Sequence, residues 1–288
     1  MWLSFGLLGA AIVAVWLPDI PMGAVRRLPP WQALFVAAVI AGLVDGPLTW
    51  PAPLALGAIW LAAWASTQSA RPRERGAWTV LAAVLALAFA ASLLPGFTSP
   101  VVAANIKLSA ASMPMTMSAS FDKPAAGLIL LVYLCSRVRK NSEWTGVVAE
   151  GIGVGAITAI VVIALVASTG VIRLDPKLPS IAPAWLVMNL MQTSLLEEAF
   201  FRGIVQERLA RALAHRPQWR YLPIAVASAL FGLAHSGGGL LLVLVASLAG
   251  IGYGIAYART GRIEAAVLAH VTLNTIHFLG FTYPYAVR

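Results

Sequence analysis

Five polar side chains lie inside long apolar stretches of this chain, where groups that ionise or form hydrogen bonds are rare. They are Glu197, Glu198, His235, His270 and Asn274. Placing an ionisable group in lipid costs free energy, so such residues are candidates for function by default. Carboxylates and imidazoles transfer protons, and imidazole and amide groups donate hydrogen bonds to developing negative charge. These residue types therefore indicate acid–base chemistry that is shielded from bulk water.

The two carboxylates are adjacent, in the stretch Leu-Leu-Glu-Glu-Ala-Phe-Phe-Arg at residues 195–202. In a helix, Glu198 and Arg202 share a face because they are four residues apart, so they can form an ion pair that keeps Glu198 charged and structural. Glu197 points about 100° away around the helix and is available to act as a general base. The alternative is a charge cluster at the cytoplasmic end of the helix, which Glu207 and Arg208 would extend.

The histidines and the asparagine lie on two later apolar runs. His235 follows Phe231 by four residues, near the end of a run. The alternative to a catalytic role is a structural histidine whose hydrogen bonds are satisfied at a helix interface. His270 and Asn274 are also four apart, so they face the same way and could both donate hydrogen bonds to an oxyanion. His277 continues that stripe and is interpreted as structural. A nucleophilic role for Ser236 is disfavoured, because the sequence around it matches a serine protease motif poorly.

The elements that carry these residues are predicted to be membrane helices. The chain has 288 residues, of which 60% are hydrophobic and 11% charged, whereas a soluble domain is typically about a quarter charged. The apolar runs are continuous rather than alternating, which excludes membrane strands. The expected fold class is all-α, a polytopic transmembrane bundle of about ten helices. The apolar runs lie near 2–17, 31–49, 51–67, 76–95, 124–136, 145–168, 184–205, 221–236, 239–257 and 263–280.

The placement of basic residues predicts the orientation in the membrane. Fifteen of the 20 lysines and arginines follow odd-numbered runs, or end them, and the other five fall on the opposite side. Cytoplasmic loops carry such an excess, so both termini and the long loop 96–123 are expected outside. The net charge of +9 is then explained without nucleic acid as a partner. The single cysteine, Cys135, excludes a disulfide-stapled fold.

Small and aromatic residues indicate how the helices pack. Gly151 and Gly155, and likewise Gly250 and Gly254, are four residues apart, which is typical of close helix–helix contact. Tryptophans such as Trp50, Trp144 and Trp185 lie at or beside run ends, where an aromatic belt at the membrane interface would place them.

Three motifs in order resemble those of a known family. They are Glu-Glu-x-x-x-Arg at 197–202, Phe-x-x-x-His at 231–235 and His-x-x-x-Asn at 270–274. On apolar helices this set resembles the CPBP family, the intramembrane CAAX-protease and bacteriocin-processing endopeptidases that include the type II prenyl-protein proteases. The resemblance covers roughly residues 190–280. It implies a protease core within 141–288, preceded by helices of unassigned role at 1–140.

The resemblance also implies roles for the residues. Glu197, assisted by His235, would activate a water molecule, and His270 and Asn274 would stabilise the oxyanion. Glu198 and Arg202 would support them. No cofactor is favoured, because there is no His-Glu-x-x-His motif and the helix neighbour of His270 is an asparagine. The open alternative is a zinc ion held by Glu197, His235 and His270.

The resemblance and the composition together predict the setting of the protein. The expected substrate is a membrane-anchored protein or peptide within the lipid bilayer. The composition, rich in alanine, arginine and tryptophan, indicates a bacterial inner-membrane protein. A non-catalytic immunity or scaffold protein and a proton-coupled transporter are the competing functions.

Overall fold

The computed structural model describes residues 2–23 and 26–287 of the chain. They form two compact units that interleave in sequence. The first unit comprises Met1–Pro100, Ser118–Leu134 and Met191–Glu197, and the second comprises Val101–Met117, Cys135–Leu190 and Glu198–Arg288. Both are helical, as expected from the apolar runs, and two short antiparallel ribbons that the sequence analysis did not predict accompany the helices.

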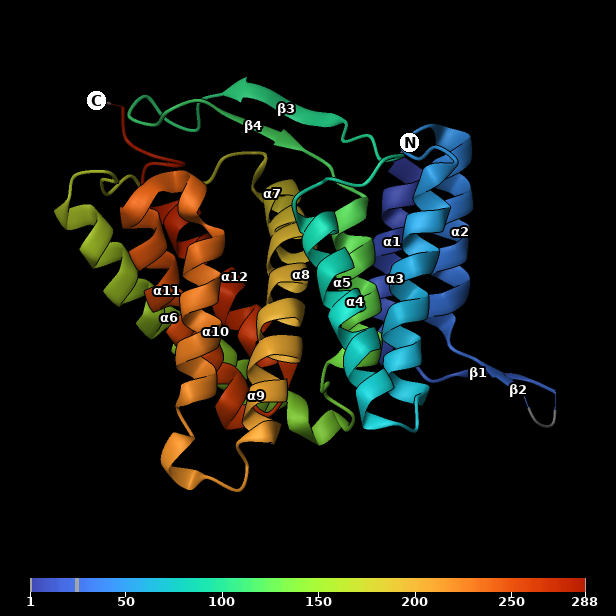
Figure 1. Cartoon of the computed structure of the whole chain (residues 1–288). Helices are drawn as coiled ribbons and strands as arrows, with labels where there is room; N and C mark the ends of the chain where they lie inside the picture. Colours follow the sequence, from blue (N-terminus) through green and yellow to red (C-terminus); the bar gives the residue numbers. More distant parts are fainter. Residues whose placement is uncertain (1, 24–25, 288) are drawn as a thin grey trace. The chain divides into compact units, whose positions relative to one another are not determined.

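The first unit is a bundle of five helices (Figure 1). Helix α5 lies at its centre, because almost every one of its residues is buried and it packs against α1, α3 and α4. Gly127 of α5 lies against Leu195 and Leu196, so the stretch 191–197 packs on this helix. The elements are α1 (Trp2–Val13), η1 (Ala14–Trp16), β1 (Ile20–Met22), β2 (Arg26–Leu28), α2 (Pro30–Asp45), α3 (Pro51–Gln68), α4 (Pro72–Ala90) and α5 (Asp122–Leu134).

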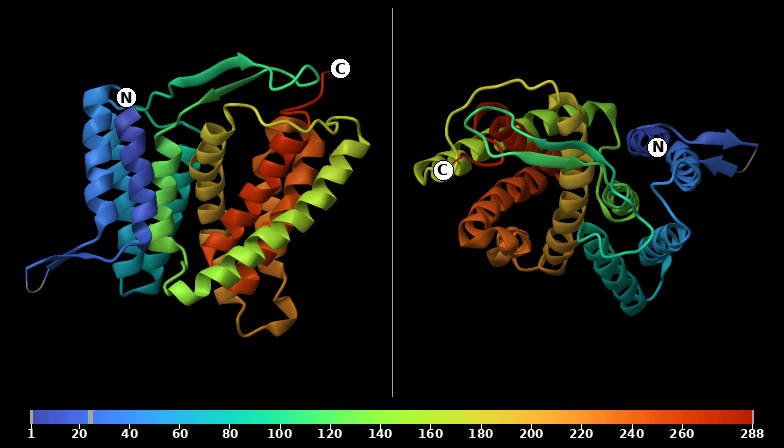
Figure 2. Two further views of the ribbon diagram at one scale, coloured as in Figure 1. Left: turned by 180° about the vertical axis from the view of Figure 1, so that it is seen from behind. Right: turned by 90° about the horizontal axis from the view of Figure 1, so that it is seen from above.

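The second unit is built around three long helices. Helix α6 crosses α11 and α12 obliquely and packs on both, and α10 packs on α11 (Figure 2). A ribbon of β3 and β4 accompanies them. The elements are β3 (Val101–Ile106), β4 (Met115–Ser118), η2 (Asn141–Glu143), α6 (Trp144–Ser168), η5 (Pro217–Trp219), α10 (Leu222–Ala234), η6 (Ser236–Gly238), α11 (Gly239–Thr260) and α12 (Ile263–Gly280).

One continuous helical rod carries the adjacent carboxylates. It alternates between α-helical and wider π-helical turns, in the order α7 (Ala182–Met188), η3 (Asn189–Ser194), α8 (Leu195–Glu198), η4 (Ala199–Gln206) and α9 (Glu207–Ala212). The predicted run 184–205 lies within this rod, which Figure 1 shows in yellow-brown. Wide turns of this kind occur mostly as short insertions in α-helices, frequently at functional sites.

Within residues 2–23 and 26–287, three helices are long and apolar enough to cross a membrane. They are Asn141–Ser168, Ser236–Thr260 and Ile263–Gly280. Two further apolar helices, Trp2–Trp16 and Pro30–Asp45, are shorter. An all-α membrane fold is therefore confirmed, whereas the predicted number of about ten spans is not established by helix length and composition.

The paired glycines are positions of close helix packing, as predicted. A Cβ atom on Gly155 would lie 2.7 Å from the carbonyl oxygen of Ala269, and one on Gly151 would lie 2.9 Å from that of Ala265. Helices α6 and α12 can approach this closely only because both α6 residues lack a side chain.

The tryptophan prediction is wrong for Trp185. Its side chain is buried in a cluster with Met117 and Phe278, and its ring stacks on that of Phe278 with centroids 4.0 Å apart. The indole therefore packs inside the second unit, where it joins α7 to α12. Nearness to a run end could not predict this, because a Trp at such a position can face either lipid or a neighbouring helix.

Candidate active site

A buried charge network connects the rod to α12. The guanidinium Nε of Arg202 lies 3.0 Å from Oε2 of Glu198, and both side chains are fully buried. The ion pair predicted from the four-residue spacing is therefore present. The other carboxylate oxygen of Glu198 lies 2.9 Å from Nδ1 of His270. Glu198 thus joins two cationic or hydrogen-bonding partners that are 68 residues apart in sequence.

The guanidinium of Arg202 is held on its other sides by a carbonyl and two aromatic rings. Its Nη2 donates to the carbonyl oxygen of Gly250 at 2.7 Å. Its central carbon lies 5.1 Å from the ring centroid of Phe231 and 5.5 Å from that of Tyr253. A buried charge is tolerated only when it is paired and hydrogen-bonded, and these contacts provide both.

The ring of His270 is fixed in position by Glu198 and by stacking. It lies parallel to the ring of Tyr253, with centroids 4.6 Å apart, and edge-on to Phe231 at 5.8 Å. A carboxylate accepts hydrogen bonds, so Nδ1 carries the proton that Glu198 binds. The neutral ring then presents a lone pair at Nε2. It becomes a donor at Nε2 only when it carries both protons.

His235 lies immediately after α10, although the predicted run 221–236 places it inside a helix. Its Nδ1 donates to the carbonyl oxygen of Phe231 at 2.8 Å, because a carbonyl can only accept. Nε2 of the neutral ring is consequently the acceptor. Its ring centroid lies 4.7 Å from that of Phe231, whose ring also contacts His270. The structure thus connects the two histidines through the ring of Phe231.

Asn274 contacts a residue that the sequence analysis did not select. Its Nδ2 donates to Oδ1 of Asn189, at the first residue of η3, over 3.3 Å. Asn189 is polar in an apolar run, which is a signal that could have identified it. Of the two aromatic partners of Arg202, Phe231 is the first residue of the Phe-x-x-x-His motif, whereas Tyr253 had no such signal, because it is an ordinary residue of an apolar helix.

Glu197 lies beside Glu198 on the single turn of α8 and is partly buried. Consecutive helical residues point about 100° apart, so the two carboxylates leave the helix in different directions. Glu198 is committed to Arg202 and His270. The division between a structural and a catalytic carboxylate stays a prediction.

No group of three or more His, Cys, Asp or Glu side chains is placed to hold a metal ion within 2–23 and 26–287. The set predicted as zinc ligands, Glu197, His235 and His270, is therefore not assembled as one, and we derive no step through a metal.

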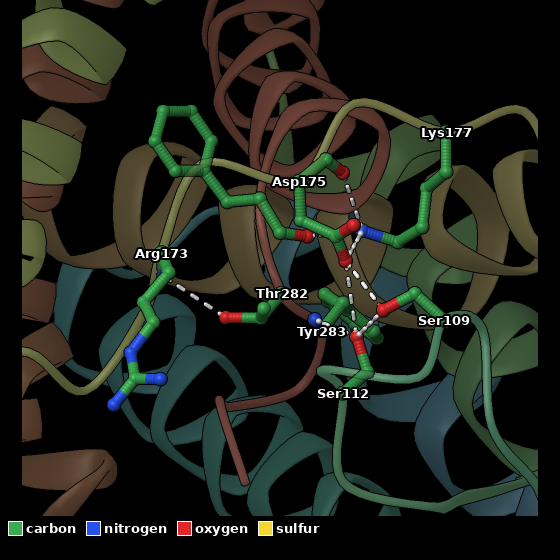
Figure 3. A network of polar contacts seen from close by, with 8 residues as sticks. Ser109, Ser112, Arg173, Asp175, Lys177, Thr282 and Tyr283 are labelled. Carbon is green, nitrogen blue, oxygen red and sulfur yellow. Dashed lines mark hydrogen bonds and ion pairs between the residues drawn. The ribbon is translucent and has the colours of Figure 1, made fainter.

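A second polar network lies at the end of the second unit where α12 finishes (Figure 3). Asp175 accepts a hydrogen bond from Ser109 at 2.6 Å and pairs with Lys177 at 3.2 Å, and Lys177 also donates to the carbonyl of Phe281. The bond from Ser109 is the main reason why the pKa of Asp175 is below its ordinary value, although burial opposes it. We call these loops, 109–112, 171–177 and 281–287, the clasp.

The clasp and the basic loops lie at opposite ends of the long helices. At the clasp end, the Thr282 amide donates to the Arg173 carbonyl, after α12 has ended. At the other end, where α12 begins, Arg262 pairs with Glu143 at 3.0 Å. Part of the predicted cytoplasmic side, 137–144 and 259–262, is therefore gathered at one end of the second unit.

A comparison of the chain with models of protein families tests the predicted resemblance. Residues 179–276 match the model of the type II CAAX prenyl endopeptidase Rce1-like family. The chain carries an Rce1-like segment. The match spans 98 of the 288 residues, from just before α7 into α12. It includes every residue of the three motifs, so the resemblance predicted from them is confirmed.

The Rce1-like segment supports a CAAX-type membrane protease in general. Together with the apolar helices, it indicates a peptidase that is an integral membrane protein. No curated protein and no solved structure gives a significant match to the chain.

Proposed function

We propose that this protein is an intramembrane endopeptidase that hydrolyses a peptide bond of a membrane-anchored protein or peptide. The observation that carries the proposal is the buried network of Glu198, Arg202 and His270 inside the Rce1-like segment. A buried ion pair is seldom retained for stability alone, because apolar residues of similar volume are often as stable. A protease that must hold polar groups in an apolar setting has a use for it.

In the proposed reaction, Glu197 removes a proton from water with the help of Nε2 of His235, and the resulting hydroxide attacks the peptide carbonyl. The oxyanion accepts hydrogen bonds from the amide of Asn274 and from His270 in its doubly protonated form. The proton taken by Glu197 passes to the leaving amine. Glu198 holds His270 through Nδ1 and directs Nε2 toward the reaction.

The membrane topology and the division of the chain into two parts are also proposals. All ten apolar runs cross the membrane, with loops 137–144 and 206–220 in the cytoplasm of a bacterial cell. Residues 141–288 form the protease core, and the helices of 1–140 adapt it to its substrate. The fifteen basic residues on one side support this orientation.

The test compares the native protein with Glu197→Gln, purified in detergent, on an internally quenched farnesylated peptide that ends in a CAAX sequence. In parallel, quantitative proteomics of membranes that carry either protein identifies native substrates. Glu150→Gln is the control, because this α6 carboxylate pairs with the exposed Arg259. We expect Glu197→Gln to fold normally and to lose cleavage, and the control to retain it.

Two outcomes contradict the proposal. If native and Glu197→Gln membranes give identical peptides and neither protein cleaves the probe, the chain is a non-catalytic relative. If Glu197→Gln cleaves and Glu198→Gln folds normally without cleaving, the roles of the two carboxylates are reversed.

A further inference from the structure

Asn189 and Asn274 form an amide pair between two apolar helices. The Nδ2 of Asn274 on α12 donates to Oδ1 of Asn189, where α7 passes into the π-helical η3. Both side chains are partly buried. An amide in an apolar helix is costly unless it is hydrogen-bonded, so the two residues stabilise each other's position.

The surrounding contacts make the relative position of the two amides rigid. Trp185 precedes Asn189 by one helical turn, and Phe278 follows Asn274 by one turn. Their rings stack at 4.0 Å, only 11° from parallel, and the indole Nε1 of Trp185 donates to the hydroxyl of Tyr283 at 3.3 Å. One turn on the other side, His270 is bound to Glu198. The amide pair is thus held between two fixed contacts on α12.

The hydrogen bond to Asn189 also sets the direction of the remaining N–H of Asn274. The NH₂ group of Asn274 has two N–H donors that diverge in the plane of the amide. Because one of them points to Asn189, the direction of the second is determined. An acceptor oxygen at Asn189 also favours the rotamer in which the NH₂ of Asn274, rather than its carbonyl oxygen, faces this side.

We propose that Asn189 is a positioning residue, which orients the amide of Asn274 so that its second N–H meets the oxyanion of the scissile peptide. This inference rests on the proposed function, in which Asn274 supplies one oxyanion hydrogen bond. Asn189 does not touch the substrate. Its effect on the reaction passes through Asn274.

The experiment is a double-mutant cycle on the same farnesylated CAAX probe, with kcat and KM measured separately. Asn274→Ala should lower kcat by about 10²–10³-fold with little change in KM. Asn189→Leu removes the acceptor while roughly keeping the volume, and should lower kcat by up to about 10²-fold, the loss expected for a misplaced group. Asn189→Leu with Asn274→Ala should be no slower than Asn274→Ala alone, because the second change removes the group that Asn189 positions.

A conservative variant separates positioning from packing. Asn189→Asp keeps an oxygen acceptor, so its kcat should lie closer to the native value than to that of Asn189→Leu. Thermal midpoints are measured for every variant, and Asn189→Ala replaces Asn189→Leu if the leucine variant does not fold. Equal activity of Asn189→Leu and the native protein overturns the inference, as do multiplicative losses in the double variant or a loss in KM alone.

The design also distinguishes this inference from the function on which it rests. If Asn274→Ala cleaves as fast as the native protein, the oxyanion role of Asn274 is wrong and the inference falls with it. If Asn274→Ala is slow while Asn189→Leu is not, only the positioning role of Asn189 is wrong. If the native protein does not cleave the probe and the proteomic comparison of membranes also shows no cleavage, both are overturned.

Discussion

Replacement of Glu198 by glutamine should destabilise the protein strongly, and the structure indicates by how much. Glutamine keeps the shape of Glu198 but removes the charge that pairs with Arg202 and binds His270. The guanidinium would then be buried without its carboxylate partner, and it would keep the Gly250 carbonyl and the two aromatic rings. Removing one member of a buried ion pair costs about 3–5 kcal/mol.

The remaining contacts of Arg202 reduce this cost. The rings of Phe231 and Tyr253 still face the cation, and a desolvated cation–π contact contributes up to about 2 kcal/mol. We therefore expect a loss near the lower end of the range, about 3 kcal/mol. For a chain of this size that corresponds to a fall in Tm of roughly 6–12 °C.

Thermal unfolding in detergent can be read with a thiol-reactive dye, because the chain has one cysteine. The Sγ of Cys135 lies 3.7 Å from the carbonyl oxygen of Ala199 on η4, so the dye reports on the helix that carries Arg202. The control is Glu74→Gln, whose pair with Arg71 is largely exposed and should contribute less than about 1 kcal/mol.

A double variant tests the cause of the loss. Glu198→Gln with Arg202→Met removes both charges, and should be more stable than Glu198→Gln alone, since a buried pair replaced as a whole often costs little. A midpoint for Glu198→Gln within about 2 °C of the native value, under 1 kcal/mol, would refute the reasoning. So would a double variant that is less stable than the single one.

Three further predictions concern packing, pH and metal. Gly155→Ala should destabilise the protein by about 1–3 kcal/mol, because its Cβ would meet the backbone of Ala269. Gly153→Ala, on the same helix, has open space around its Cβ and should stabilise the protein by up to about 1 kcal/mol. The thermal midpoints of the two variants check both signs. The pKa of Asp175 is lower in the folded protein than in the unfolded chain, where it is about 3.9. Its contribution to the free energy of unfolding is therefore present above that pH and is lost as the pH falls through the folded value. The difference in Tm between the native protein and Asp175→Asn should be clear at neutral pH and vanish in acid. Chelator-treated protein should retain cleavage, and measurement of bound zinc beside activity checks this; stoichiometric zinc whose removal stops cleavage and whose return restores it would show that the expectation is wrong.

Much of the helical fold could be predicted because the α-helices overlap continuous apolar runs, with the exception of α9 in the charged stretch Glu207–Ala212. Close packing at Gly155 also followed from the sequence, since small residues one turn apart have few other uses in an apolar helix. The ribbon β3–β4 was not predicted: β4 alternates apolar and polar residues over only four positions, Met115–Ser118, and β3, Val101–Ile106, does not alternate. The direction in which Trp185 faces was equally inaccessible, since it depends on which helix lies beside α7.

The contacts of the candidate site were predictable only within one helix. The Glu198–Arg202 pair follows from α-helical spacing, but the bond from His270 to Glu198 joins residues 72 positions apart. Asn189 and Glu198 both contact α12, yet in a regular α-helix residues nine positions apart lie about 180° apart. The wide turns of η3 take up this difference, and no residue type in the sequence announces them.

The clasp has a consequence for the order in which the protein folds during synthesis. It joins early and late segments, because the Ala286 amide donates to the Val171 carbonyl and the Tyr285 carbonyl accepts from the Met113 amide. More than 160 residues separate the loop 109–112 from the segment 281–287, and a ribosome that adds about 5–20 residues per second needs roughly 10–30 s to add them. The loops 109–112 and 171–177 therefore remain without these hydrogen bonds until the segment 281–287 has been made.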